Sequence, residues 1–445
     1  MPSGASPTGA GVIRRRRRLL RYTAIGVAVL VLGVAGAGWA AYEKLDANIT
    51  PDNAAAAELA RYEKERPTAL VRDAQNILLI GSDSRSGDEN RKYGRDSGTE
   101  RSDTTILLHL SADRRSATAV SLPRDLMVDV PGCRRPDGTR TEPVFAMFNY
   151  AFATGGSACT IRTVEKLTNI RVDHHMVVDF YGFKEMVDAV DGVEVCLKAP
   201  VNDKAAKLRL PAGKVTLDGE QALGYVRARK SLGDGSDTDR MERQQRFLGA
   251  LVNKVQSNDV LLNPVKLYPV LDAATSSLTT DPELASLRGL YQLVRGLRHI
   301  PTERVQFLTV PRTPYVHDTN RDQLVEPAAK ELFARLRTDT AVEVTKETPK
   351  QPPERTPTPT PTQAPPTQAQ TPQAQTPLPK KNPTEDGGEG AYDSSSESEY
   401  ESEYDYEEES YDDGKSAGKR AGSRAGTPDP APTFRGNTAA EDTCG

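Results

Sequence analysis

One uncharged apolar run constrains the fold of this chain more than any other part of its sequence. Residues Thr23 to Tyr42 carry no charged side chain and are mostly Ala, Val, Leu, Ile and Gly. A helix rises about 1.5 Å per residue, so a helix of this length spans the roughly 30 Å hydrocarbon core of a bilayer. The run therefore predicts one transmembrane helix over residues 23–42, with every folded domain before or after it.

The charges on either side of this run predict its orientation. Arginines at positions 14–18 and 21 precede it, whereas the mixed-charge segment 43–46 follows it. Because Lys and Arg accumulate on the cytoplasmic side of a span, residues 1–22 are expected to form a cytoplasmic basic segment. Trp39 and Tyr42 then lie at the outer interface. We expect a single-pass protein of the cell membrane whose working part is extracytoplasmic.

Two other interpretations of the N-terminal region are weaker. Ala35, Gly36 and Ala37 offer small residues for cleavage of a secretory signal. The apolar run, however, is longer than the ~7–15 residues of a signal's apolar region, which favours an uncleaved signal-anchor. The arginine run is also typical of a nucleic-acid patch, but its place directly before a span favours a role in topology. No nucleic-acid partner is expected.

Composition divides the rest of the chain into three parts. Residues 43–73 are expected to form an extracytoplasmic stalk, because the pattern from Asn53 to Arg72 is mostly polar and helical and ends at Pro67. Residues 74–340 mix strand and helix signals and are long enough to bury a core. Residues 341–445 are rich first in Pro, Thr and Gln and later in acidic residues, so a disordered tail is expected. The net charge of −4 averages over these parts and predicts no partner.

The four cysteines show no spacing typical of a zinc site. Cys133 and Cys159 each lie beside Gly- or Pro-containing surface sequence. If this part of the chain faces an oxidising exterior, the two are expected to close a disulfide between a loop and a helix. The alternative is a pair of buried free thiols.

Three short apolar runs predict neighbouring strands. They cover Asn76–Gly81, Thr104–Leu110 and Ala117–Pro123. The short connection between the second and third runs predicts an antiparallel pair. The entry of the second strand and the exit of the third then lie at one edge of the sheet, so Asp103 and Arg124 should converge there.

Other charged residues are expected at the same edge. Asp83 and Arg85 follow the first strand, Arg101 enters the second, and Asp125 follows the third; the first pair arrives there if the first strand is antiparallel to the second. Carboxylates together with arginines suit a divalent ion that holds phosphate. The competing interpretation is a set of surface salt bridges with little consequence.

A second arginine cluster lies further along the chain. Arg227 and Arg229 alternate in the segment GYVRARK, and an extended conformation there places both on one side. A helix starting near Asp239 places a further group, Arg240, Arg243 and Gln244, on one face of its first turns. Free backbone N–H groups and the helix dipole favour anions at that end. Several guanidinium groups near one point suit bidentate binding of phosphate.

These motifs together resemble one family. The segments NILLIGSDSR, RSDTTILLHL, SLPRDLMVDVPG, FNYAFATGG, VDHHMVVDFYGF, GEQALGYVRARK and DRMERQQRFL are similar in sequence and order to the LytR-CpsA-Psr family, over roughly residues 76–255. The resemblance implies an α/β fold, a three-layer α/β/α domain with a central mixed sheet and a hydrophobic cavity for a polyprenyl chain. In this chain the domain follows one transmembrane helix.

The resemblance also implies an activity and site roles. Members transfer a glycopolymer from a polyprenyl-pyrophosphate carrier to peptidoglycan, forming a phosphodiester, with Mg²⁺ at the pyrophosphate. By motif, Asp83 and Asp103 match the Mg²⁺-associated carboxylates. The positions that match pyrophosphate binding are arginines, joined by one glutamine: Arg85, Arg101, Arg124, Arg227, Arg229, Arg240, Arg243 and Gln244.

Some choices stay open in the sequence. Phosphoryl transfer needs in-line positioning and charge neutralisation, which Mg²⁺ and Arg supply. A base must accept the acceptor's proton, and Asp103 and Asp125 are both candidates. The same groups suit a pyrophosphatase that uses water, and a non-enzymatic regulator is a third interpretation that the extracytoplasmic placement disfavours. His174 and His175 are expected to be structural residues at the start of a strand.

Overall fold

The computed structural model describes residues 9–82, 102–204, 206–228, 232, 237–256, 264–345 and 433–441. A long helix, α1 (Gly9–Asn48), contains the predicted span. Its 29-residue stretch Leu20–Asn48 is long and apolar enough to cross a membrane, and its most apolar window packs against no other part of the described chain. The expected apolar helix over residues 23–42 is therefore present, and it continues into the polar residues that follow.

The segment after α1 belongs to the folded domain, so the expectation of a separate stalk over residues 43–73 is wrong. Helix α2 (Asn53–Arg61) is capped by the Asp52 carboxylate, which accepts a hydrogen bond from the Ala55 N–H. Ala55 and Leu59 are buried against α3 (Asn149–Thr168). Further on, Arg66 donates to Glu165 of α3 at 2.8 Å. Ala55 and Leu59, four residues apart, form a short apolar face on this helix, which the surrounding charged residues hide in the sequence pattern.

Nine strands within the described residues form one mixed sheet, in the order β1-β12-β7-β2-β3-β4-β13-β17-β16. In that order they are Thr50–Pro51, Leu278–Thr280, His174–Val178, Gln75–Ser82, Ser102–Leu110, Ala117–Leu122, Val305–Thr309, Thr433–Thr438 and Glu343–Thr345. Strands β2, β3 and β4 are successive antiparallel neighbours. β7 lies parallel to β2, and β13 lies parallel to β4. The three predicted strands and their pairing are confirmed.

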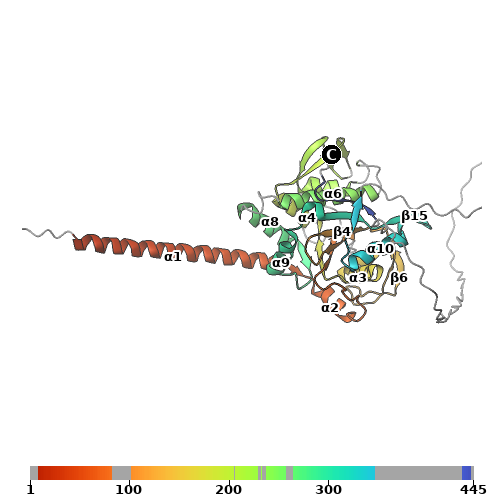
Figure 1. Ribbon diagram of the computed structural model, residues 1–445, viewed down its shortest axis with the longest axis horizontal. Coiled ribbons are helices and arrows are strands. Elements are labelled where there is room, and N and C mark those ends of the chain that lie inside the picture. Colours follow the sequence, from red (N-terminus) through yellow and green to blue (C-terminus); the bar gives the residue numbers. More distant parts are fainter. Residues whose placement is uncertain are drawn as a thin grey trace, which may run out of the picture. The chain divides into compact units, whose positions relative to one another are not determined.

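Helices cover both faces of this sheet. Successive residues of a strand point to opposite faces of the sheet. On one face, Leu78 joins a core with α2, α3 and α10 (Glu326–Arg337). On the other face, Ile77 joins a core that includes residues of α6 (Asp237–Gln256) and α9 (Leu287–Leu297). Figure 1 shows α3 and α10 on one side of β4 and α6 on the other. The predicted three-layer α/β/α arrangement with a mixed sheet is confirmed.

A smaller core lies beside the main sheet. It combines α4 (Phe180–Ala189) and α5 (Gly219–Arg227) with β8 (Val193–Leu197), paired to β11 (Gly213–Leu217), and β9 (Val201–Asp203), paired to β10 (Leu208–Leu210). Phe247 of α6 is buried in this core, where it contacts the rings of Phe183 and Tyr225. Helix α6 thus packs into this smaller core and into the core on one face of the main sheet, and it joins the two.

The remaining described elements flank these cores. They are the hairpin β5 (Met127–Val130) with β6 (Val144–Met147), the hairpin β14 (Arg312–Tyr315) with β15 (Asp318–Leu324), the helix α8 (Pro264–Ser276) and the short helix η2 (Thr302–Arg304).

The segment expected to be extended around Arg227 is helical. Asp218 accepts from the Gln221 N–H while the Gln221 side chain accepts from the Asp218 N–H, a capping box that starts α5. The helix ends at Arg227, and Arg229 lies outside the described residues. The expected alternation of Arg227 and Arg229 along a strand is therefore wrong for Arg227, because the capping signal at Asp218 begins a helix that includes it.

The folded domain also extends beyond Thr340. Strand β16 continues it to Thr345, and β17 returns far later in the chain to pair with both β13 and β16. Phe434 of β17 is buried in the core beneath α10. The expectation that residues 341–445 form only a tail is wrong for 341–345 and 433–441.

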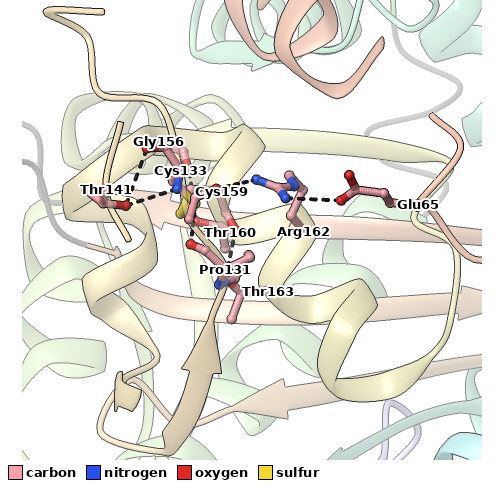
Figure 2. Close-up of a disulfide and its surroundings, with 10 residues drawn as sticks. Glu65, Pro131, Cys133, Thr141, Gly156, Cys159, Thr160, Arg162 and Thr163 are labelled. Atoms are coloured by element: carbon pink, nitrogen blue, oxygen red, sulfur yellow. Dashed lines mark hydrogen bonds and ion pairs between the residues drawn. A yellow bond between two sulfur atoms is a disulfide. The ribbon is translucent and has the colours of Figure 1, made fainter. Parts of the chain in front are cut away.

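A disulfide joins Cys133 to Cys159, as predicted, and Figure 2 shows it between the loop after β5 and α3. Its Cα atoms are 5.6 Å apart. Arg162 of α3 donates to the Gly132 carbonyl at 2.7 Å, so a hydrogen bond supports the same junction. Among the described cysteines none is free, since Cys196 is disulfide-bonded as well.

Candidate functional site

One edge of the central sheet gathers several of the charged residues that the sequence singles out. Strands β2, β4, β7 and β13 run in the same direction, so their carboxyl ends lie along this edge, and β3 begins there. In open α/β sheets ligands bind outside the carboxyl ends of the strands. We call this side of the molecule the carboxyl edge.

Asp103, Arg124 and Asp125 converge at the carboxyl edge as predicted. Nη1 of Arg124 donates to Oδ1 of Asp103 at 2.7 Å, and Nε lies 3.3 Å from Oδ2 of Asp125. All three side chains are partly buried, with 22% of Arg124 and 33% of Asp103 exposed. The arginine is thus held between two carboxylates that keep contact with solvent.

A third charged pair belongs to this cluster, and the sequence does not predict it. Arg321 of β15 approaches Oδ1 of Asp125 with Nη1 at 3.4 Å. The neighbouring Asp322 forms an ion pair with Arg312 of β14. No local sequence pattern predicts this contact, because Arg321 and Asp125 are 196 residues apart in the chain.

Backbone hydrogen bonds fix the turn that carries Arg124. The Arg124 carbonyl accepts from the Asn149 N–H at 3.0 Å, and the Asp125 carbonyl accepts from the Asp322 N–H at 3.1 Å. The Leu126 carbonyl accepts from the Phe148 N–H at 2.8 Å. The start of α3 and the β15 strand therefore position both charged side chains, which reduces the reorganisation that ligand binding requires.

Helix α6 directs its first turn toward the same edge. Gln245 is buried and donates to Ser121 near the end of β4 and to Thr309 at the end of β13. Two turns later, Asn253 donates to the Ala439 carbonyl, whose own N–H bonds the start of β13 at Val305. The helix runs back along the sheet from the carboxyl ends, so its N-terminal turn and the buried Arg240 lie toward the carboxyl edge.

Arg227 lies toward this edge from the other side. Its guanidinium carbon is 4.3 Å from the centroid of the Phe180 ring, a cation–π contact. Phe180 begins α4 directly after β7 and the capping Asp179, at the carboxyl end of that strand. The two arginine clusters therefore approach one edge, although the sequence alone gave no register between them.

Among the described residues, Arg243 and Gln244 donate to backbone carbonyls near the end of α5. The Arg243 guanidinium donates to the carbonyls of Tyr225, at 2.9 Å, Ala228 and Leu232. Gln244 donates to the Val226 carbonyl at 3.2 Å. A cation bound to unpaired carbonyls caps the C-terminal end of α5. Burial lowers the pKa of Arg243 from its ordinary value.

Four predicted site residues, Asp83, Arg85, Arg101 and Arg229, lie outside the described residues. The first three belong to the segment between β2 and β3, and both of its ends are at the carboxyl edge, because Ser82 pairs with Ser102.

His174 and His175 start β7, as predicted, at the opposite edge of the sheet. Nδ1 of His174 lies 3.2 Å from Asp281, and Nε2 of His175 lies 3.2 Å from Asp52. Burial by itself lowers the pKa of His174, but the hydrogen bond and charge of Asp281 outweigh it and raise that pKa. Burial by itself raises the pKa of Asp52, but hydrogen bonds from His175 and Ala55 lower it overall.

The fold and this edge define a class: a three-layer α/β/α domain, preceded by an apolar helix, whose carboxyl edge carries arginines interleaved with aspartates. The chain belongs to the LytR_cpsA_psr family, whose model matches residues 46–338. This match begins before α2, in agreement with the packing of that helix on the domain.

Individual relatives agree with the family. The chain is 40% identical to the probable cell wall biosynthesis protein LcpB of Corynebacterium glutamicum over 46% of this chain and 47% of that one, so it spans about half the length of this relative. It is 29% identical to TagT of Bacillus subtilis, a polyisoprenyl-teichoic acid–peptidoglycan teichoic acid transferase, over 70% of this chain and 93% of that one.

A solved structure of similar fold is protein gbs0355 from Streptococcus agalactiae, with a TM-score of 0.50 and 23% identity over 60% of this chain and 88% of that one. At this identity the likeness concerns the fold.

Proposed function

We propose that this protein transfers a glycopolymer, with its phosphate, from a polyprenyl-pyrophosphate carrier to a hydroxyl of peptidoglycan. The P–O–P bond of the pyrophosphate breaks, polyprenyl phosphate leaves, the hydroxyl gives up its proton, and a phosphodiester bond forms. The family relation and the transferase activity in the name of TagT support the reaction class. The observation that carries the proposal is the convergence of Arg124 with Asp103, Asp125 and Arg321 at the carboxyl edge, toward which Arg227 also lies.

The chemistry of these residues suits pyrophosphate. Guanidinium groups bind phosphate oxygens bidentately and remain charged at any physiological pH. In phosphoryl transfer, positive groups fixed before the reaction stabilise the charge that develops on the phosphoryl oxygens. Arg124, held between two carboxylates and by a turn with three backbone hydrogen bonds, is preorganised for this role.

The donor set also fits Mg²⁺. This ion prefers carboxylate oxygens and substrate phosphates and keeps part of its water shell. Asp103 is partly exposed at the carboxyl edge, and we propose that it holds the ion together with Asp83, which lies outside the described residues. Bound Mg²⁺ would supply charge neutralisation at the pyrophosphate.

A carboxylate of the same cluster accepts the proton of the acceptor hydroxyl in this proposal. Asp103 and Asp125 both contact Arg124, so either carboxylate lies beside the group that would hold the phosphate. The carboxylate that holds the metal is the less available base, which favours Asp125.

We propose the cell membrane as the site of action, with the N-terminus in the cytoplasm and the domain outside. The apolar stretch of α1 and the preceding arginines support this topology. The disulfide between Cys133 and Cys159 supports it independently, because such bonds persist in oxidising compartments.

The experiment is a transfer assay with the full chain in lipid nanodiscs, a labelled polyprenyl-pyrophosphate glycan and peptidoglycan fragments, with Mg²⁺ or with a chelator. We expect label on the peptidoglycan, and a loss of that product with the chelator that Mg²⁺ restores. Label released only as a water-hydrolysed product would contradict transfer and identify a pyrophosphatase, whereas full activity in chelator would refute the metal.

A further inference from the structure

Helix α9 presents a basic and apolar face that has no cover in the described chain. None of its residues is fully buried. Tyr291 and Val294 are 59% and 53% exposed, and at a spacing of three residues they are neighbours on the helix surface, so together they form one exposed apolar spot. Leu293 and Leu297 pack instead against the sheet core, so the helix keeps one apolar side inside and leaves another outside.

The exposed side also gathers positive charge. With 100° per residue, Tyr291, Val294, Arg288, Arg295 and Arg298 fall within about 120° of the helix circumference. The three arginines are exposed, and α9 contains no acidic residue. Among the described residues, no carboxylate forms an ion pair with any of the three. Arginine side chains extend past apolar neighbours toward a polar layer, so this face is amphipathic in the manner of interfacial helices.

The helix is fixed close to the membrane span. The Asp46 carboxylate accepts a hydrogen bond from the Leu287 N–H, the first residue of α9, at 2.7 Å. On α8, Asp272 binds both Lys44, at 2.9 Å, and Asn48, at 2.8 Å. Three residues from the end of α1 thus hold α8 and the start of α9.

The helix geometry sets the depth of this junction. Helix α1 continues without a break to Asn48. Asp46 therefore lies four residues, or about 6 Å, beyond Tyr42 at the end of the apolar run. The headgroup layer on each side of a bilayer is roughly 5–7 Å thick. The start of α9 is then at the level of the lipid headgroups.

We propose that α9 docks on the membrane surface, with Tyr291 and Val294 among the headgroups and Arg288, Arg295 and Arg298 on anionic phospholipids. Basic residues near an anionic surface each add attraction, and apolar side chains add burial. The domain would then contact the membrane at two points, the span and α9, which would restrict its orientation relative to the bilayer more than the span alone. This inference rests on the membrane anchor and is independent of the reaction catalysed.

Tryptophan quenching tests it, because Trp39 is the single tryptophan of the chain. Two variants are made in a Trp39→Phe background: Tyr291→Trp, and the control Val316→Trp at a residue that is 72% exposed in the β14–β15 turn. Each protein is placed in nanodiscs of brominated phosphatidylcholine, with and without phosphatidylglycerol. We expect the Tyr291→Trp protein to be quenched, more strongly with phosphatidylglycerol, and the Val316→Trp protein to stay unquenched. Adding Arg288→Glu, Arg295→Glu and Arg298→Glu should remove the difference that phosphatidylglycerol makes.

The wild-type protein reports the anchor separately. If Trp39 is quenched while the Tyr291→Trp protein emits like the Val316→Trp control, the span is inserted and docking of α9 is refuted. Blue-shifted but unquenched emission of the Tyr291→Trp protein would also refute it, because protein would then cover the helix. Equal quenching with and without phosphatidylglycerol would overturn the role of the arginines.

Discussion

At the scale of single residues, the contacts of a guanidinium group separate a binding role from a structural one. Arg243 is buried on three backbone carbonyls, whereas Arg227 stacks on Phe180 toward the carboxyl edge. We expect Arg243→Gln to lower the free energy of unfolding by about 2–4 kcal/mol, because buried acceptors lose their donors. Arg227→Gln should change it by no more than about 1 kcal/mol while reducing transfer.

Chemical unfolding and the transfer assay on both variants, in the full chain, check this contrast. A stable Arg243→Gln protein with lost transfer would restore the pyrophosphate role that the sequence motif predicts for Arg243.

The pair of His174 and Asp281 makes stability depend on pH. The pKa of His174 is raised in the folded protein, so the pair contributes fully below the unfolded pKa of about 6.5 and its contribution is lost as pH rises through the folded pKa. Asp281 has a lowered pKa, because hydrogen bonds and the charge of His174 outweigh the effect of burial, so it stays ionised in this range. We expect His174→Gln to cost about 1.5 kcal/mol near pH 5.5 and less near pH 8.

Thermal unfolding of the wild type and the variant at both pH values measures this cost. The other histidines contribute equally to both proteins, so their contributions to the pH dependence cancel in the difference. A cost that is equal at the two pH values, or larger at the higher one, contradicts the ion pair.

The sequence predicts which charged residues lie at the site better than it predicts which side chains and carbonyls they contact. Asp103, Arg124 and Asp125 were predictable because each flanks a short apolar run whose pairing follows from one short turn. Arg321 and Asp322 were not, since only the tertiary fold brings β15 to Asp125. The carbonyl contacts of Arg243 were also hidden, because they depend on where α5 ends.

At the scale of elements, β17 is the part of the fold that composition conceals. It follows a long Pro- and acid-rich stretch but supplies Phe434, which is 4% exposed, to the core beneath α10. We expect Phe434→Ala to destabilise the domain by about 3–5 kcal/mol. The neighbouring exposed Thr433→Ala should be nearly neutral.

Denaturant unfolding of the two variants compares them directly. Equal stability of both proteins would mean that β17 is not part of the folded sheet in solution.

The disulfide stabilises the junction between the β5 loop and α3. It closes a loop with a sequence separation of 26 residues. Restricting the unfolded chain over such a loop is worth about 3 kcal/mol. We expect the double variant Cys133→Ala, Cys159→Ala to lose about this much stability, while Thr139→Ala in the same exposed loop loses little.

Thermal unfolding without reductant compares these proteins. A double variant as stable as the wild type would contradict the bond. The bond was predictable from the flanking Gly and Pro.

The sequence is ambiguous for α5, because alternating arginines favour an extended segment whereas the capping box at Asp218 starts a helix.

At the scale of the whole molecule, the apolar helix α1 and the α/β/α domain are joined by contacts of α1 with α8 and α9. The α/β/α layers were predictable only through the resemblance of an ordered set of motifs to the family, whereas three strands of the sheet were predictable from apolar runs. The extent of the domain was not, because α2, β16 and β17 contribute to the core through a few residues in otherwise polar sequence. Residues 46–338, which the family model matches, include α2 but not the closing strands β16 and β17.

The central claim is that Arg124 holds the transferred phosphate at this edge. The most direct measurement is the transfer rate of the full chain with Arg124→Lys, beside Arg115→Lys at an exposed residue after β3. A lysine keeps the charge but loses the fork that binds two oxygens, so we expect a loss of about 100-fold or more for Arg124→Lys, with unchanged folding and a normal rate for the control. Transfer at the wild-type rate by a folded Arg124→Lys protein would contradict the assignment of this edge as the active site.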